Sequence, residues 1–237
     1  MTGRSEPTPP GCTGGATPVA STTTPCRSAT PLSTTVLETI AKCPAMKSDL
    51  ETLQKDGWTV GWGAPGGGTS ANRQTKKITV DPNLGATDAD VVSGLTHEMG
   101  HAKYTLPTVS PAGLTREQYI NQSVQANLED EGEATLTQIG YKDCLKKGGG
   151  PDVPLSGAKS ADYAAIAAKY PNAGDRSTAR TEIANKFGEG EHPSNCPAQT
   201  YRQYYEKPCC APACGTGSRG WAESLTDNQW KAQGGTL

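Results

Sequence analysis

His97, Glu98 and His101 are the residues whose types and spacing most directly predict chemistry, because they form the pattern HExxH. Residues four apart lie on one face of an α-helix, so both imidazoles can bind one Zn²⁺ at about 2.0–2.1 Å. Glu98 can then reach a water molecule at the metal rather than the metal itself. A histidine pair that only forms hydrogen bonds in a core is the alternative, but it does not explain a buried stripe of His, Glu and His. The pattern therefore predicts a metal site.

The residues ahead of the motif predict that it lies on a buried helix. Val91, Val92 and Leu95 supply an apolar helical face, and Asp88 or Asp90 is expected to cap the first turn. The residues between and after the two histidines are small or flexible, which suits a helix that is packed against several neighbours.

A catalytic zinc usually takes three protein ligands and leaves a fourth position for water. The chain has three histidines, and the third, His192, is remote in sequence, so the remaining ligand is either His192 or a carboxylate. Four carboxylates occupy five positions in the run from residue 129 to residue 133, on a second predicted helix. Such a run is ordinarily a solvated acidic face. The need for a ligand about one helix away favours a ligand role here.

HExxH followed by Glu131-Gly132-Glu133-Ala134, which matches EGxA, resembles the gluzincin metallopeptidases over roughly residues 58 to 140. The resemblance implies a zincin-like fold, one catalytic Zn²⁺ and Glu131 as the third ligand, with Glu129 as the alternative. It places Glu133 where an acid orients a ligand histidine. The sequence departs from thermolysin-like members at Asp130, where they have Asn.

In sites of this family a downstream histidine or tyrosine stabilises the oxyanion, so the resemblance draws attention to the region after residue 188. His192 lies in a polar, glycine-containing loop, although a histidine beside proline is ordinarily just exposed. Tyr201, Tyr204 and Tyr205 follow closely and are alternative donors. We select His192 and Tyr204 as the candidates.

The predicted fold class is α+β, with a small antiparallel sheet and a mostly helical C-terminal part. Residues 1–32 are rich in Pro, Thr, Gly and Ser and predict a linker or arm, followed by one zincin-like domain over 33–237 with a cysteine-rich region from about 188. Pro44 should break a helical pattern that begins at Ser33. The other expected elements are a hairpin of strands 58–62 and 77–80 around a glycine-rich loop, a long helix from the Thr115/Gln118 capping box to about Leu145, helices near 163–170 and 177–187, and a tail with little regular structure.

Composition bounds the partners and the compartment. Lys and Arg total 22 against 24 Asp and Glu, so the net charge of −2 supports neither a nucleic-acid nor an anionic-membrane partner. No apolar run approaches the roughly 20 residues of a membrane helix, and the N-terminus lacks the hydrophobic core of a signal peptide. Eight cysteines predict up to four disulfides and an oxidising place of action. The alternative for Cys196, Cys209, Cys210 and Cys214 is a second, structural zinc site.

Three functions are compatible with these features. The first is a secreted bacterial zinc metallopeptidase acting on protein, in which Zn²⁺ activates water and Glu98 is the general base. The second is an antibacterial effector domain that cleaves peptidoglycan as an amidase or endopeptidase, with a possible immunity protein as partner; this idea is an analogy from the cysteine content and the linker. The third is a non-enzymatic module that retains zinc only for structure, although such a site has no need of Glu98.

Overall fold

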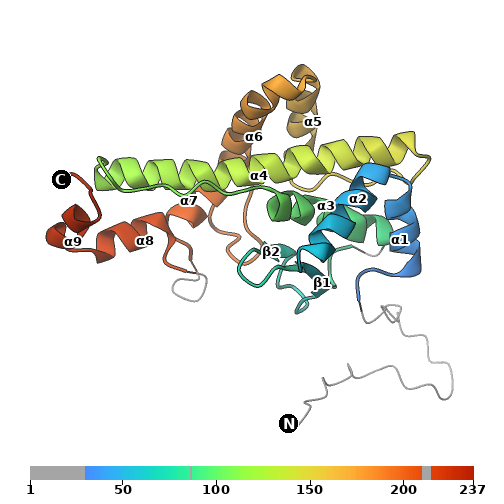
Figure 1. Cartoon of the computed structure of the whole chain (residues 1–237), viewed down its shortest axis with the longest axis horizontal. Coiled ribbons are helices and arrows are strands. Elements are labelled where there is room, and N and C mark those ends of the chain that lie inside the picture. Colours follow the sequence, from blue (N-terminus) through green and yellow to red (C-terminus); the bar gives the residue numbers. More distant parts are fainter. Residues whose placement is uncertain (1–29, 86, 210–214) are drawn as a thin grey trace, which may run out of the picture.

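The computed structural model describes residues 30–85, 87–209 and 215–237, and these form a mixed α+β fold that is mostly helical (Figure 1). Residues 1–29 of the expected arm lie outside the described part. The elements in chain order are α1 (Thr34–Ala41), α2 (Pro44–Lys55), β1 (Thr59–Trp62), β2 (Ser70–Asn72), β3 (Lys77–Val80), α3 (Asp88–Lys103), α4 (Arg116–Lys147), α5 (Ser160–Lys169), the 3₁₀ turn η1 (Ala173–Asp175), α6 (Arg176–Gly190), α7 (Tyr201–Glu206), α8 (Gly217–Ser224) and α9 (Asp227–Ala232).

The break predicted at Pro44 is confirmed, because α1 ends at Ala41 and Pro44 opens α2 at its first turn, where a proline needs no hydrogen-bond donor. Cys43, between the two helices, is disulfide-bonded to Cys144 near the end of α4, 101 residues away in sequence. The bond therefore joins the N-terminal helices to the longest helix of the fold.

The predicted two-stranded hairpin is wrong. The sheet has the order β1-β3-β2, in which β1 pairs parallel with β3 and only β2 pairs antiparallel with it. Parallel strands need a crossover connection, and the glycine-rich segment between β1 and β2 supplies it. The carboxylate of Asp81 accepts hydrogen bonds from the backbone amides of Gly66 and Gly68, both at 2.9 Å, which holds this segment against the end of β3.

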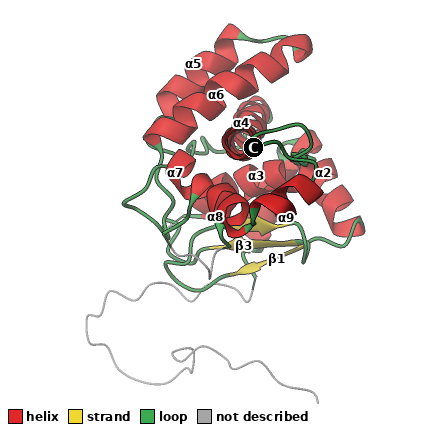
Figure 2. Ribbon diagram, turned by 90° about the vertical axis from the view of Figure 1, so that its left-hand side faces the viewer, coloured by secondary structure: helices red, strands yellow, loops and turns green. Residues whose placement is uncertain are grey.

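The long helix α4 is the central layer of the molecule. In the view along α4, the α5–α6 pair lies on one side of it, and α3 and then the sheet lie on the other (Figure 2). Its predicted start is confirmed: the Thr115 hydroxyl accepts a hydrogen bond from the backbone amide of Gln118, and the Gln118 side-chain oxygen accepts one from the backbone amide of Thr115. Helices α3 and α4 approach closely at Gly100, where an added Cβ would lie 2.5 Å from the Cα of Ala134.

The C-terminal region is more regular than the sequence predicts. The helices expected near 163–170 and 177–187 are confirmed as α5 and α6, but the expected irregular tail contains α7, α8 and α9. Their cores are small, and Trp230 of α9 is fully buried against α4 and α8. Short amphipathic helices of six to eight residues give a weak periodic signal, which explains why the sequence pattern misses them.

Two disulfides are present in the described part of the chain, and the second joins Cys196 to Cys209. That bond takes two of the four thiolates that the alternative structural zinc site requires; Cys210 and Cys214, like Cys12 and Cys26, lie outside the described residues. Disulfides persist in oxidising compartments, so these bonds indicate an oxidising place of action. Within the described ranges, no helix is long and apolar enough to cross a membrane.

Candidate metal centre

Helix α3 carries the HExxH motif and is fixed at its start by a capping box. Thr87 is the N-cap: it accepts a hydrogen bond from the amide of Asp90, and the Asp90 carboxylate accepts one from the Thr87 amide at 3.0 Å. Asp90 thus takes part in the cap as predicted, but Asp88 does not cap the helix. Most of α3 is buried between α4 and the sheet.

His97, His101 and Glu131 meet where α3 crosses α4. The Nε2 atoms of the two histidines are 3.2 Å apart, His97 Nε2 is 3.2 Å from Glu131 Oε2, and His101 Nε2 is 3.4 Å from the same oxygen. A tetrahedral zinc with bonds of about 2.0–2.1 Å has ligand–ligand edges of about 3.3–3.4 Å. The three atoms therefore have the spacing of three corners of such a site, and two imidazoles with a carboxylate are a donor set that suits zinc and similar cations.

Hydrogen bonds among these three groups are a poorer explanation of the geometry. Each imidazole has one Nε2 position, so a single proton on His101 cannot serve both His97 and Glu131 at once. A cation between the three atoms satisfies all of them together. The residues present therefore fit a metal ion.

The electrostatics of the cluster favour positive charge at its centre. Burial lowers the pKa of His101, but the charge of Glu131 and the contact with Asp130 outweigh it and hold that pKa well above its usual value. Burial raises the pKa of Glu131, but the charge of His101 and hydrogen bonds from both imidazoles bring it far below its usual value. Glu131 is therefore charged, which is the state in which a carboxylate binds a cation, and the same negative charge that holds a proton on His101 favours a cation in place of that proton.

Three further residues contact the candidate ligands and hold them in place. Asp130 lies 3.0 Å from the Nδ1 atom of His101, and Arg73 donates to both Asp130 Oδ1 and the carbonyl of His101 at 2.6 Å. Tyr205 donates a hydrogen bond to Glu131 Oε1, which leaves Oε2 facing the histidines. The buried Nδ1 atom of His97 has no hydrogen-bond partner and no contacting carboxylate comparable to Asp130 among the described residues.

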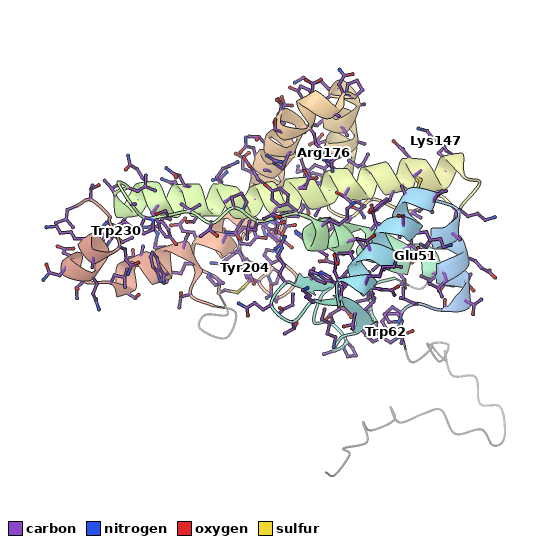
Figure 3. All side chains as sticks on the ribbon, in the orientation of Figure 1. Glu51, Trp62, Lys147, Arg176, Tyr204 and Trp230 are labelled. Atoms are coloured by element: carbon purple, nitrogen blue, oxygen red, sulfur yellow. A yellow bond between two sulfur atoms is a disulfide. The ribbon has the colours of Figure 1, made fainter. Side chains whose placement is uncertain are left out.

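We predict that Arg73→Ala weakens zinc affinity by about 10–100-fold, as loss of a residue that orients a ligand typically does. The variant frees Asp130, and through it His101. The measurement is competition for zinc against a chromophoric chelator. Arg176→Ala is the matched control, since Arg176 forms an ion pair with Glu133 and lies across α4 from Tyr204 (Figure 3). Equal affinity in Arg73→Ala and wild type would contradict this role.

Glu98 is buried beside the triad, with 6% of its surface exposed, and lines the same cavity. Burial raises its pKa above the usual value, although the two histidines act in the opposite direction. Its carboxylate forms no hydrogen bond with either histidine in the described structure, and Glu98 is not among the three residues whose atoms cluster at ligand spacing.

The cavity that contains the triad has a volume of about 610 Å³. The cavity is lined by the glycine-rich segment, by the edge strand β2 and by residues between Glu191 and Tyr205. His192 and Tyr204 both line the cavity, and His192 is an exposed residue. The Tyr204 hydroxyl lies 3.4 Å from the side-chain amide nitrogen of Asn195. A larger cavity of about 690 Å³, beside Lys103 and Tyr141, contains none of the three ligands.

The remaining carboxylates of the acidic run lie elsewhere. Glu129 accepts a hydrogen bond from Thr181, and Glu133 pairs with Arg176 at 2.6 Å. The expectation that Glu133 orients a histidine is therefore wrong. Asp130 occupies that position, because Glu133 is two residues beyond Glu131 and so faces α6 instead of α3. The sequence analysis did not predict the contact of Arg73 with Asp130, because no local sequence pattern indicates it. It named Tyr205 only as one of three tyrosines and did not predict its hydrogen bond to Glu131.

No protein-family model, curated protein sequence or solved structure matches this chain.

Proposed function

We propose that the chain is a zinc-dependent hydrolase that cleaves amide bonds of peptides, with a zincin-like arrangement of its site. The observation that carries the proposal is the set of three ligand atoms at tetrahedral spacing, with a buried carboxylate, Glu98, beside them in an open cavity. A site that holds zinc only for structure is usually closed by four protein ligands. Three ligands with an adjacent base support catalysis.

His97, His101 and Glu131 would hold the metal, which when bound polarises a carbonyl and lowers the pKa of water to about 7. Glu98 then accepts a proton from the attacking water and delivers it to the leaving nitrogen. His192 and Tyr204, which line the same cavity, are the proposed donors to the oxyanion. Tyr205 is occupied with Glu131, so its proposed role is to position that ligand.

The edge strand β2 supports an extended peptide as substrate. Strand β2 lies at the end of the sheet order, and Ser70 and Ala71 line the cavity. The unpaired edge of a strand can bind an extended chain through main-chain hydrogen bonds. Secretion of the enzyme agrees with the disulfides. The first proposed substrate class is protein. The second is a peptide linked to a glycan, as in peptidoglycan, and an aromatic cavity beside the metal centre favours it.

Removal and return of the metal tests this function. We expect one zinc per chain by mass spectrometry, and cleavage of denatured casein or of peptidoglycan peptides that stops on chelation and resumes when zinc is added. The release of new amino groups measures cleavage. A protein that binds no added zinc, or that binds zinc and cleaves neither substrate, would contradict the proposal.

A further inference from the structure

A second cavity, of about 500 Å³, adjoins the metal centre and is lined by aromatic side chains. Tyr119, Trp221, Tyr204 and Tyr205 all contribute to it, although aromatic residues make up only 5% of the chain. Tyr119 and Trp221 pack against each other with ring centroids 4.9 Å apart, and Tyr119 also contacts the buried Trp230. The aromatic wall is therefore held in place before any ligand arrives, which lowers the entropy lost on binding.

The same cavity contains a buried polar atom without a partner. Ser123 is nine-tenths buried, and its Oγ has no hydrogen-bond partner among the described residues. Its neighbour Asn127 uses its amide nitrogen on the Ser123 carbonyl at 2.8 Å, which leaves the Asn127 carbonyl oxygen as an acceptor. A hydroxyl left dry costs about 1–3 kcal/mol. This position therefore indicates a ligand that brings a hydrogen-bonding group.

The chemistry of the lining limits the ligand further. None of the lining residues in the described part of the chain is charged, so a carboxylate, phosphate or amine would be buried without a counter-ion. A plain aromatic side chain would cover the rings but leave Ser123 unsatisfied. A sugar ring has an apolar C–H face for the aromatic side chains and hydroxyl or acetamido groups at its edge for Ser123 and Asn127. We propose that this cavity binds a neutral sugar, with an N-acetylated amino sugar as the best match.

The sugar site and the metal centre can serve one substrate. Asn127, Tyr204 and Tyr205 line both cavities, so the two spaces share a wall. This inference rests on the proposed amide hydrolysis for its functional meaning: the substrate class would be a peptide joined to an N-acetylated glycan, with the cleaved amide close to the sugar. Substrates without the sugar would lose this contact and bind more weakly.

The test is calorimetric titration of the zinc-loaded chain with the β-1,4-linked tetramer of N-acetylglucosamine. We expect saturable binding that weakens about tenfold in Trp221→Ala, as expected for loss of an aromatic contact, and recovers in Trp221→Phe. Ser123→Ala should also weaken binding, and it keeps a good helix former on α4. Trp62→Phe, on β1 outside both cavities, is the matched control and should bind the tetramer like wild type.

The possible results separate this inference from the proposed function, because sugar binding requires no hydrolysis. Binding that depends on Trp221 and Ser123 would support the sugar site even if no amide is cleaved. No saturable binding at millimolar tetramer, or equal binding by Trp221→Ala and wild type, would overturn it even if peptides are hydrolysed. A tyrosine-containing peptide that binds in a Trp221-dependent way, and that the tetramer fails to displace, would also overturn it.

Discussion

Glu98→Gln is expected to lower the rate of amide hydrolysis by about 10²–10⁴-fold, the contribution typical of a general base, while zinc content stays at one per chain. Glutamine has almost the same size as glutamate, so the buried position beside the triad remains filled. It cannot accept a proton, so water is no longer activated. Glu98 supplies none of the three clustered ligand atoms, which belong to His97, His101 and Glu131. The amount of zinc bound should therefore be unchanged.

The measurement pairs the initial rate of cleavage with zinc content from the same preparation. Glu129→Gln is the matched control, since it changes a carboxylate on α4 that contacts Thr181 and does not line the cavity. Hydrolysis at wild-type rate by Glu98→Gln would show that another residue accepts the proton. Loss of zinc from that variant would instead assign Glu98 to the ligand set.

Glu131→Ala should lose zinc almost completely on dialysis without chelator. Among the described residues, the variant removes the only carboxylate oxygen within 3.4 Å of both Nε2 atoms, so the loss should exceed the roughly 10–100-fold that removal of a supporting residue costs. It also leaves the hydroxyl of the half-buried Tyr205 without its acceptor. Activity should disappear together with the metal.

Metal content by mass spectrometry tests this prediction, and Glu133→Ala is the control on the same helix. Glu133 pairs with Arg176 and Arg180 on the side of α4 that faces α6, so its removal should leave zinc in place. Zinc retained in full by Glu131→Ala would move the third ligand to Glu129, Glu133 or His192. Zinc lost equally from both variants would point to unfolding, which circular dichroism would reveal.

The features of the site that were predicted from sequence have local causes. The spacing of His97 and His101 and the capping box at Thr115 depend on residues three or four apart, and the structure has both helices where they are expected. That Glu131 approaches them follows from the EGxA resemblance. Arg73 is 57 residues from its partner Asp130 in sequence, and Tyr205 is 74 residues from its partner Glu131. No local sequence pattern identifies contacts over such separations.

The sheet was mispredicted for a similar reason. The predicted strands 58–62 and 77–80 are strands in the structure, the first of them beginning at Thr59, but the choice between a hairpin and a parallel pair depends on the route of the connection. Asp81 holds the connection in place by accepting hydrogen bonds from the backbone amides of Gly66 and Gly68. No local sequence pattern predicts these two contacts. The helices α7 to α9 are too short for a clear period.

The candidate metal centre constrains the evolution of two glycines, Gly100 and Gly132, in addition to its ligand residues. A side chain at Gly100 would meet the backbone of Ala134 in α4, and one at Gly132 would meet the backbone of Arg180 in α6. The separation of the three candidate ligand atoms thus depends on two close backbone contacts of α4, one with α3 and one with α6. Descendants of this sequence can vary many surface positions, yet the candidate metal centre can persist only with glycine at these two positions, neither of which supplies one of its three ligand atoms.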